Sequence, residues 1–292
     1  MFRQLLLSFV ALLWLPACAQ TPAGFPAAQP YQPVTYRHIE RTNPPQHLHA
    51  VTIELSEPAV AIRVVPAGDA PRPADDAWPT TLLQTSDVAE REHFDIAVNG
   101  DFFAGRDKRL VAGRDFAWFK GNAARPLGPA MTDGKLWHAG NTYALVVREG
   151  GKVSIERLDT VPADARQIVG GNPMLVRNGK EVAPAGVAAP RTAVGLDKEG
   201  KRLTILVVDG RRADYAAGFT LPQLAAEMVK LDCWTALNLD GGGSTTLVMR
   251  DPATGKCHVI NRPSDGHDLP VSLSLERAVC NVLGITVGKQ PR

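Results

Sequence analysis

Short apolar runs separated by turn residues recur along most of this chain, and they constrain its fold more than any other feature. Such runs are typical of β-strands bounded by Gly, Pro, Asn and Asp. No internal repeat of fixed period accompanies them. The runs before the C-terminal part of the chain occupy residues 49–67 (broken near residue 57), 94–100, 131–140, 142–158, 166–180 and 191–210, and further runs follow from residue 235.

Two segments have a helical period instead. Residues 80–93 form one amphipathic pattern, with Leu82, Leu83 and Val88 on an approximate inner face. Residues 220–232 form the other, and Thr220 with Gln223 predicts a capping box at its start. Many strands with two helices predict an α+β fold, with a mixed, mostly antiparallel sheet, a few packed helices and a single domain.

Three of the strand-like runs end in Asn-Gly or Asp-Gly, at Asn99, Asp209 and Asp240. These pairs are common in two-residue hairpins. Here a longer polar or glycine-rich segment follows each pair, without an immediate returning strand. Glycines at strand ends let a ligand approach the main chain and receive its N–H groups. We therefore expect these polar side chains to share one rim of the fold and to face a ligand.

The sequence NLDGGGST contains the densest of these patterns, with Asp240 followed by Gly241, Gly242, Gly243 and Ser244. Three glycines in a row are costly to order, so the backbone there needs space that a side chain would block.

Arginines accompany the carboxylates. Arg191 begins a strand-like run, Arg211 follows Asp209 and its glycine, and Arg277 follows Glu276 before the last strand. Several guanidinium groups at strand edges are suited to binding a phosphate or carboxylate.

Other classes of function lack support in the sequence. The formal net charge is +2, which gives no electrostatic case for a nucleic-acid partner. There is no phosphate-loop spacing and no Gly-x-Ser-x-Gly nucleophile motif. No metal site is expected, because His47 and His49 lie near the predicted tether, while His93, His138, His258 and His267 are scattered.

The N-terminal residues predict export. Arg3 precedes an apolar run, Leu5 to Leu15, that is short for a membrane span. LPAC favours residues 1–18 as a lipoprotein-type signal with Cys18 as the lipidated residue, while ACA also fits ordinary secretory cleavage. The first alternative implies a lipoprotein on the periplasmic face of the outer membrane, held by its lipid anchor. The second implies a soluble periplasmic or secreted protein.

Residues 19–46 are rich in Pro, Ala and Gln and predict a tether between anchor and domain. Three further cysteines remain, Cys233, Cys257 and Cys280, and the sequence does not select a disulfide pair among them.

Taken together, AVNGDFF, GGNPMLVRNG, RTAVGLD, LTILVVDGR, NLDGGGSTTLV and ERAVCNVLGI resemble the phosphodiester glycosidase family, in the family's order, over residues 93–287. The resemblance implies an α+β catalytic domain, here residues 47–290, and cleavage of a glycosidic bond whose leaving group is a phosphate ester. It implies a sugar phosphodiester or phosphorylated glycan as substrate. No cofactor is expected, because the sequence contains no recognisable ligand cluster. The positions that match the family motifs are Asn99, Gly100, Arg191, Asp209, Arg211, Asp240, Gly241, Gly242, Gly243, Ser244, Glu276 and Arg277. Asp101, Gly171 and Asn172 are further candidates for binding the substrate. Asp101 and Asn172 depart from the pattern, since glycine is common at both.

A glycosyl phosphodiester releases a phosphate monoester, which is a good leaving group. Its hydrolysis mainly needs a carboxylate for the oxocarbenium-like centre or the attacking water, and cations for the phosphate. Asp240 is the first candidate for the carboxylate, with Asp209 or Glu276 second, and the three arginines are candidates for the phosphate. Two other functions are considered: a non-catalytic glycan-binding envelope lipoprotein, and a metal-dependent phosphodiesterase, which would need a ligand cluster.

Overall fold

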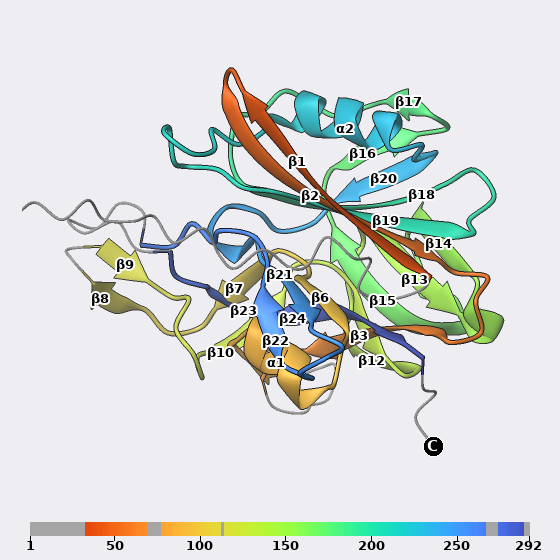
Figure 1. Ribbon diagram of the computed structural model, residues 1–292. Coiled ribbons are helices and arrows are strands. Elements are labelled where there is room, and N and C mark those ends of the chain that lie inside the picture. Colours follow the sequence, from red (N-terminus) through yellow and green to blue (C-terminus); the bar gives the residue numbers. More distant parts are fainter. Residues whose placement is uncertain (1–32, 69–76, 112–113, 267–273, 289–292) are drawn as a thin grey trace, which may run out of the picture.

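A seven-stranded antiparallel sheet forms one wall of the molecule (Figure 1). The computed structural model describes residues 33–68, 77–111, 114–266 and 274–288. In spatial order, the strands of this large sheet are β1 (Val34–Thr42), β2 (Pro45–Glu54), β19 (Arg202–Val208), β18 (Arg191–Leu196), β20 (Thr235–Asn238), β16 (Met174–Arg177) and β17 (Lys180–Glu181).

Two five-stranded antiparallel sheets enclose the main hydrophobic core together with the large sheet. The first contains β22 (Cys257–Val259), β21 (Leu247–Arg250), β6 (Ile96–Asn99), β24 (Asn281–Val287) and β3 (Val60–Pro66). The second contains β12 (Lys135–His138), β11 (Ala130–Thr132), β15 (Ala165–Gly171), β13 (Tyr143–Arg148) and β14 (Val153–Arg157). Three smaller sheets contain the remaining strands of the described residues. In the first, β10 (Ala123–Pro126) pairs with both β4 (Thr80–Thr81) and β7 (Phe103–Gly105). The other two are the pairs of β5 (Leu83–Gln84) with β23 (Ala278–Val279) and of β8 (Arg109–Val111) with β9 (Arg114–Phe116).

The main hydrophobic core lies between the large sheet and the two five-stranded sheets. It takes Val51 and Val194 from the large sheet, Ile96 and Leu283 from the second, and Leu145 from the third, all fully buried. Alternating side chains on each strand supply this inner face, which is why the apolar runs are short and closely spaced. The prediction of mostly antiparallel sheets with two helices is confirmed.

The two helices cover outer faces of the sheets (Figure 1). Helix α2 (Leu221–Lys230) packs on the large sheet, and its Thr220 and Gln223 form the predicted capping box. Helix α1 (Thr85–Arg91) packs beside β6 and is shorter than the predicted segment 80–93. The first residues of that segment form the strands β4 and β5, which pair with β10 and β23. Strand pairing therefore overrides the helical period there.

The folded domain begins before residue 47. Strand β1 pairs with β2 in a continuous register from Val34↔Ile53 to Thr42↔Pro45. The predicted tether over residues 19–46 is therefore wrong in its last part, because residues 34–42 pair along their whole length with β2 as an edge strand. The expected signal peptide and Cys18 lie outside the described residues. Within the described part of the chain, no helix is long and apolar enough to span a membrane.

Candidate functional site

Two of the three polar strand ends lie at the same edge of the large sheet. Strand β18 is flanked by β19 and β20, both antiparallel to it. Arg191 at the start of β18 is opposite Val208, and Ala193 is opposite Asn238. Asp209 and Asp240, which follow the ends of β19 and β20, therefore leave the sheet at the edge where β18 begins.

The third strand end, Asn99, joins the second sheet to this edge. Asn99 is fully buried at the end of β6. Its side-chain Nδ2 donates to the backbone oxygen of Asp240 at 2.7 Å, and its Oδ1 accepts from Thr192 Oγ1 at 2.8 Å and from Thr246 N at 3.2 Å. Asn99 thus holds the backbone on both sides of the three glycines in place. Its side chain is fully buried and bonded to this segment, whereas the sequence predicts that it faces a ligand.

The glycine-rich segment, residues 240–244, is held close to neighbouring backbone. Asp240 N donates to Gly100 O at 3.0 Å, and Gly242 N donates to Pro190 O at 2.9 Å. Gly242 has a φ of 62°, in the left-handed region that favours glycine. A short 3-10 turn, Gly242–Ser244, then leads toward β21.

Two of the three glycines lie against an arginine guanidinium, whereas a Cβ on Gly241 would be 2.8 Å from the backbone oxygen of Pro190. A Cβ on Gly241 would be 3.8 Å from Arg191 Cδ. A Cβ on Gly242 would be 2.7 Å from a guanidinium nitrogen of Arg211. A Cβ on Gly243 would overlap the guanidinium of Arg277. The absence of side chains at Gly242 and Gly243 therefore lets two guanidinium groups approach the loop, and the absence of one at Gly241 lets the Pro190 backbone approach it. These close approaches explain why three glycines occur together.

The positions of these guanidinium groups are set by specific contacts. Arg277 Nε and a terminal nitrogen donate to the two carboxylate oxygens of Asp265, at 3.0 and 2.7 Å, and its guanidinium lies 4.1 Å from the centre of the Trp118 ring. Arg191 Nε donates to Phe219 O at 3.0 Å. Sequence reasoning missed Trp118 and Asp265, because nothing in their spacing relates them to Arg277.

Asp240 is half-buried at the start of the glycine-rich segment that these arginines contact. One of its carboxylate oxygens accepts from Gly241 N at 2.8 Å. Burial raises the pKa of Asp240 to about 6, although Ser244, the positive charge of Arg277 and the Gly241 N–H favour the ionised form. At neutral pH this carboxyl group is mostly ionised, yet it titrates close enough to neutrality to exchange protons.

A second carboxyl group, Asp101, lines a cavity of about 270 Å³ next to this loop. The cavity is also lined by Gly171, Asn172, Gly128 and Thr142. Asp101 accepts from Gly128 N at 2.6 Å and is almost completely buried. Burial raises the pKa of Asp101 to about 7, and the negative charge of Asp240 adds to the rise. Asp101 is predicted from the sequence to bind substrate, and its pKa of about 7 also makes it a candidate proton donor or acceptor.

Several buried polar atoms around the loop have no hydrogen-bond partner among the described residues. They are Asn238 Oδ1, the hydroxyls of Thr245 and Thr246, and Asn281 Nδ2. Native proteins rarely leave such atoms unpaired, and clusters of them are typical of sites that hold water or a ligand. Here they surround the segment that joins β20 to β21.

Asp209 has a different environment from Asp240. Its oxygens accept from Asn261 Nδ2 at 3.0 Å, from Arg262 N at 3.0 and 3.1 Å and from the Tyr215 hydroxyl at 3.1 Å, and His49 Nε2 lies 3.4 Å away. The residue is 1% exposed. These contacts indicate that Asp209 links the end of β19 to the segments that carry Tyr215 and Arg262.

Glu276 is also engaged elsewhere. Its two carboxylate oxygens accept from Ser86 N at 2.8 Å and from Ser86 Oγ at 2.6 Å, at the start of α1. Burial raises the pKa of Glu276. The structure thus ties Glu276 to the helix, whereas its neighbour Arg277 reaches the glycine-rich segment.

One group of side chains in the described part of the chain could hold a metal ion, and the sequence analysis did not find it. His38, Glu40 and His47 lie together on the β1–β2 hairpin. His38 and Glu40 fall within the segment predicted to be a tether, so their pairing with β2 could not be anticipated.

The model of one protein family matches most of the chain. It is described as phosphodiester glycosidase, and it covers residues 92–286. A curated relative, the bovine N-acetylglucosamine-1-phosphodiester alpha-N-acetylglucosaminidase, is 44% identical over 63 residues. That alignment covers 22% of this chain and 11% of the bovine protein, so the chain matches only a small part of its curated relative.

Solved structures show the same fold over most of the chain. The catalytic domain of the zebrafish N-acetylglucosamine-1-phosphodiester alpha-N-acetylglucosaminidase, which is auto-inhibited by its pro-peptide, has a TM-score of 0.63 at 22% identity, covering 88% of this chain and 82% of that chain. A Burkholderia pseudomallei K96243 protein described as exported has a TM-score of 0.61 at 15% identity, covering 83% and 74%. A Synechocystis protein has a TM-score of 0.54 at 15% identity, covering 87% and 62%.

Proposed function

Because the chain belongs to the phosphodiester glycosidase family, we propose that it is a hydrolase that cleaves the glycosidic bond of a sugar 1-phosphodiester. The products are the free sugar and a phosphate monoester. The observation that carries the proposal is the placement of the Arg211 and Arg277 guanidinium groups against Gly242 and Gly243, in the loop that follows Asp240. The side chain of Arg191 lies beside Gly241. This arrangement offers cations to a phosphate and a carboxylate to the atom that the phosphate leaves.

The arginines bind and stabilise the departing phosphate. Guanidinium groups match phosphate oxygens in geometry and stay charged at all physiological pH values. Arg277 is oriented by the Asp265 carboxylate and the Trp118 ring, so little reorganisation is needed when charge develops on the leaving group. Because the phosphate monoester is a good leaving group, it takes the bonding electrons with little help from an acid.

The carboxyl groups act on the sugar. When the glycosidic bond breaks, positive charge develops on the anomeric carbon, and ionised Asp240 stabilises that charge or accepts a proton from the attacking water. Asp101, with a pKa of about 7, is partly protonated at neutral pH and exchanges a proton with the substrate or water in the adjoining cavity. Two carboxyl groups with different pKa values in one site are suited to these complementary roles.

Hydrolysis in ¹⁸O-labelled water tests the reaction directly. The purified protein is incubated with a panel of sugar 1-phosphodiesters, and the products are examined by mass spectrometry. Glycosidic cleavage places the label in the released sugar. Label in the phosphate would instead indicate a phosphodiesterase, and binding of the substrates without turnover would indicate a glycan-binding protein.

We also propose that the protein is exported and anchored through Cys18. The LPAC sequence supports this, and the Burkholderia relative is described as an exported protein. In a Gram-negative host, Cys18→Ala is expected to move the protein from the outer-membrane fraction to the soluble fraction. Unchanged membrane fractionation of Cys18→Ala would contradict lipidation at this residue.

A further inference from the structure

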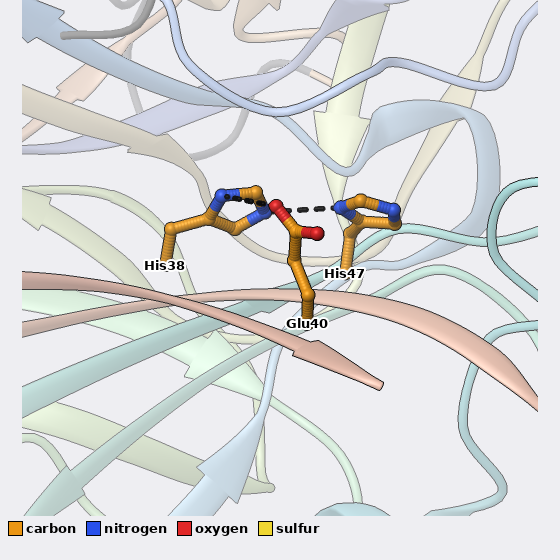
Figure 2. A group of neighbouring side chains, drawn as sticks. All are labelled: His38, Glu40 and His47. Atoms are coloured by element: carbon orange, nitrogen blue, oxygen red, sulfur yellow. Dashed lines mark hydrogen bonds and ion pairs between the residues drawn. The ribbon is translucent and has the colours of Figure 1, made fainter. Parts of the chain in front are cut away.

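Three potential metal ligands meet on one face of the β1–β2 hairpin (Figure 2). One ligand atom from each of His38, Glu40 and His47 lies within 4.8 Å of the other two. His38 Nε2 is 3.0 Å from His47 Nδ1, and His38 Nδ1 is 3.3 Å from Glu40 Oε1. The three side chains point toward one another from two adjacent strands.

The register of the hairpin explains why they meet. Residues two apart on a strand share a face, so His38 and Glu40 project on the same side of β1. Glu40 is directly opposite His47 on β2, and His38 is opposite His49. His38 and Glu40 are exposed and His47 is half-buried, so an ion can enter this face from solvent.

Neighbouring rings hold both histidines in position. The His38 ring stacks on the buried His49 ring, with centroids 4.7 Å apart and planes at 4°. The His47 ring stacks on Tyr215, with centroids 3.9 Å apart and planes at 13°. His49 is fixed in turn by the Tyr36 hydroxyl, 2.9 Å from its Nδ1. Such outer contacts orient the ligands of a metal before it binds.

We propose that His38, Glu40 and His47 bind a divalent transition-metal ion of the Zn²⁺ class. Two imidazole nitrogens and one carboxylate oxygen are a donor set that Zn²⁺ accepts, with a fourth position left for water or another ligand. Bond lengths of about 2.1 Å in a tetrahedral site separate ligand atoms by roughly 3.4 Å. One atom from each of the three side chains already lies within 4.8 Å of the other two, so small rotations of these side chains reach that geometry. Mg²⁺ and Ca²⁺ prefer sites made of oxygen atoms and are disfavoured by two imidazoles.

The ion would join the edge strand β1 to β2 next to the rim of the candidate active site. His47 O accepts from Asp209 N at 3.0 Å, and the Tyr215 ring that stacks on His47 carries the hydroxyl that donates to Asp209. An ion that binds only the folded state therefore stabilises the β1–β2 hairpin, which contacts Asp209 through His47. This site does not depend on the glycosidase reaction, and its test uses no substrate.

Calorimetric titration and thermal unfolding test the site in the chain purified without a polyhistidine tag. We expect one equivalent of Zn²⁺ to bind and raise the melting temperature, while Mg²⁺ and Ca²⁺ do neither. His38→Gln, Glu40→Gln and His47→Ala should each weaken Zn²⁺ binding at least about tenfold. The first two change exposed side chains, so they keep the test valid if His47→Ala misfolds. The matched control is His258→Ala, an exposed histidine on β22 beside Cys257.

Three results would overturn the proposal. The first is the absence of saturable Zn²⁺ binding by the folded chain. The second is unchanged affinity in folded His38→Gln and Glu40→Gln. The third is loss of Zn²⁺ binding in His258→Ala but not in His38→Gln, which would place the ion at Cys257 and His258.

Discussion

The guanidinium of Arg277 occupies the space that a side chain at Gly243 would need. Any residue larger than glycine at this position would displace Arg277 or its partner Asp265, whose carboxylate also overlaps the missing Cβ. Gly243 therefore allows a positive charge to lie directly on the loop that follows Asp240, where we propose that the phosphate binds.

Replacing the loop arginines should impair turnover far more than folding. Arg211→Ala and Arg277→Ala each remove a cation from the leaving group, so we expect kcat/KM to fall by about 10²–10³, the scale for loss of one electrostatic stabiliser. Arg277→Lys should recover only part of this, because lysine cannot make the paired contact with Asp265. Arg157→Ala, at an exposed ion pair with Asp159, is the control and should leave kcat/KM unchanged. Equal effects of Arg157→Ala and Arg277→Ala would contradict a local phosphate site.

Asp101→Asn should stabilise the protein, and the gain should depend on pH. The folded-state pKa of about 7 exceeds the ordinary value of 3.8, so folding favours the protonated acid. The stability from this preference is fully present below about pH 4 and is lost as pH rises through 7. Asparagine resembles the neutral acid, and Asp101→Asn should therefore exceed wild type by up to about 4 kcal/mol above pH 7 and converge with it near pH 4. Denaturant unfolding at several pH values measures this, and a gain independent of pH would argue against a raised pKa.

The rate should follow a bell-shaped pH profile. Asp240 must lose its proton to act on the sugar, so kcat/KM should rise as pH passes about 6. If protonated Asp101 contributes, kcat/KM should fall again above about 7, and the two apparent values belong to the coupled pair. In Asp101→Asn the alkaline decline should disappear. Persistence of that decline in the variant would assign it to another group.

Asp209→Asn should mainly affect stability. One carboxylate oxygen would become a donor facing the Tyr215 hydroxyl or Arg262 N, in a buried site that supplies donors. We expect a loss of about 1–3 kcal/mol in the free energy of unfolding. Turnover at a temperature where the variant is folded should fall by less than the roughly 10² expected for a catalytic acid or base. A folded Asp209→Asn variant with a larger loss would move Asp209 into the reaction.

The strand ends were predictable because their chemistry is local. Apolar periodicity placed β6, β19 and β20, and the polar residue after each was visible in the printed sequence. The capping box of α2 was predictable for the same reason, since Thr220 and Gln223 interact across one turn.

Contacts between distant segments were not predictable. Trp118 and Arg277 are 159 positions apart in the sequence, and only the packing of the sheets brings them to 4.1 Å. The edge strand β1 belongs to the Pro-, Ala- and Gln-rich segment that predicts a tether, and only Val34 of its residues is buried, so little in its own sequence indicates a strand. Burial of Asp209 and Glu276 likewise depends on partners far along the chain.

The central claim is that Asp240 acts in the chemistry as well as in shaping the loop. Asp240→Asn retains the size and the turn-forming tolerance of aspartate and removes its negative charge. The initial rate of sugar 1-phosphodiester hydrolysis by this variant, measured beside its melting curve, is the most direct test. We predict a loss of roughly 10² or more in turnover with nearly unchanged thermal unfolding. A folded Asp240→Asn variant with wild-type turnover would contradict the account and leave Asp240 as a turn-forming residue.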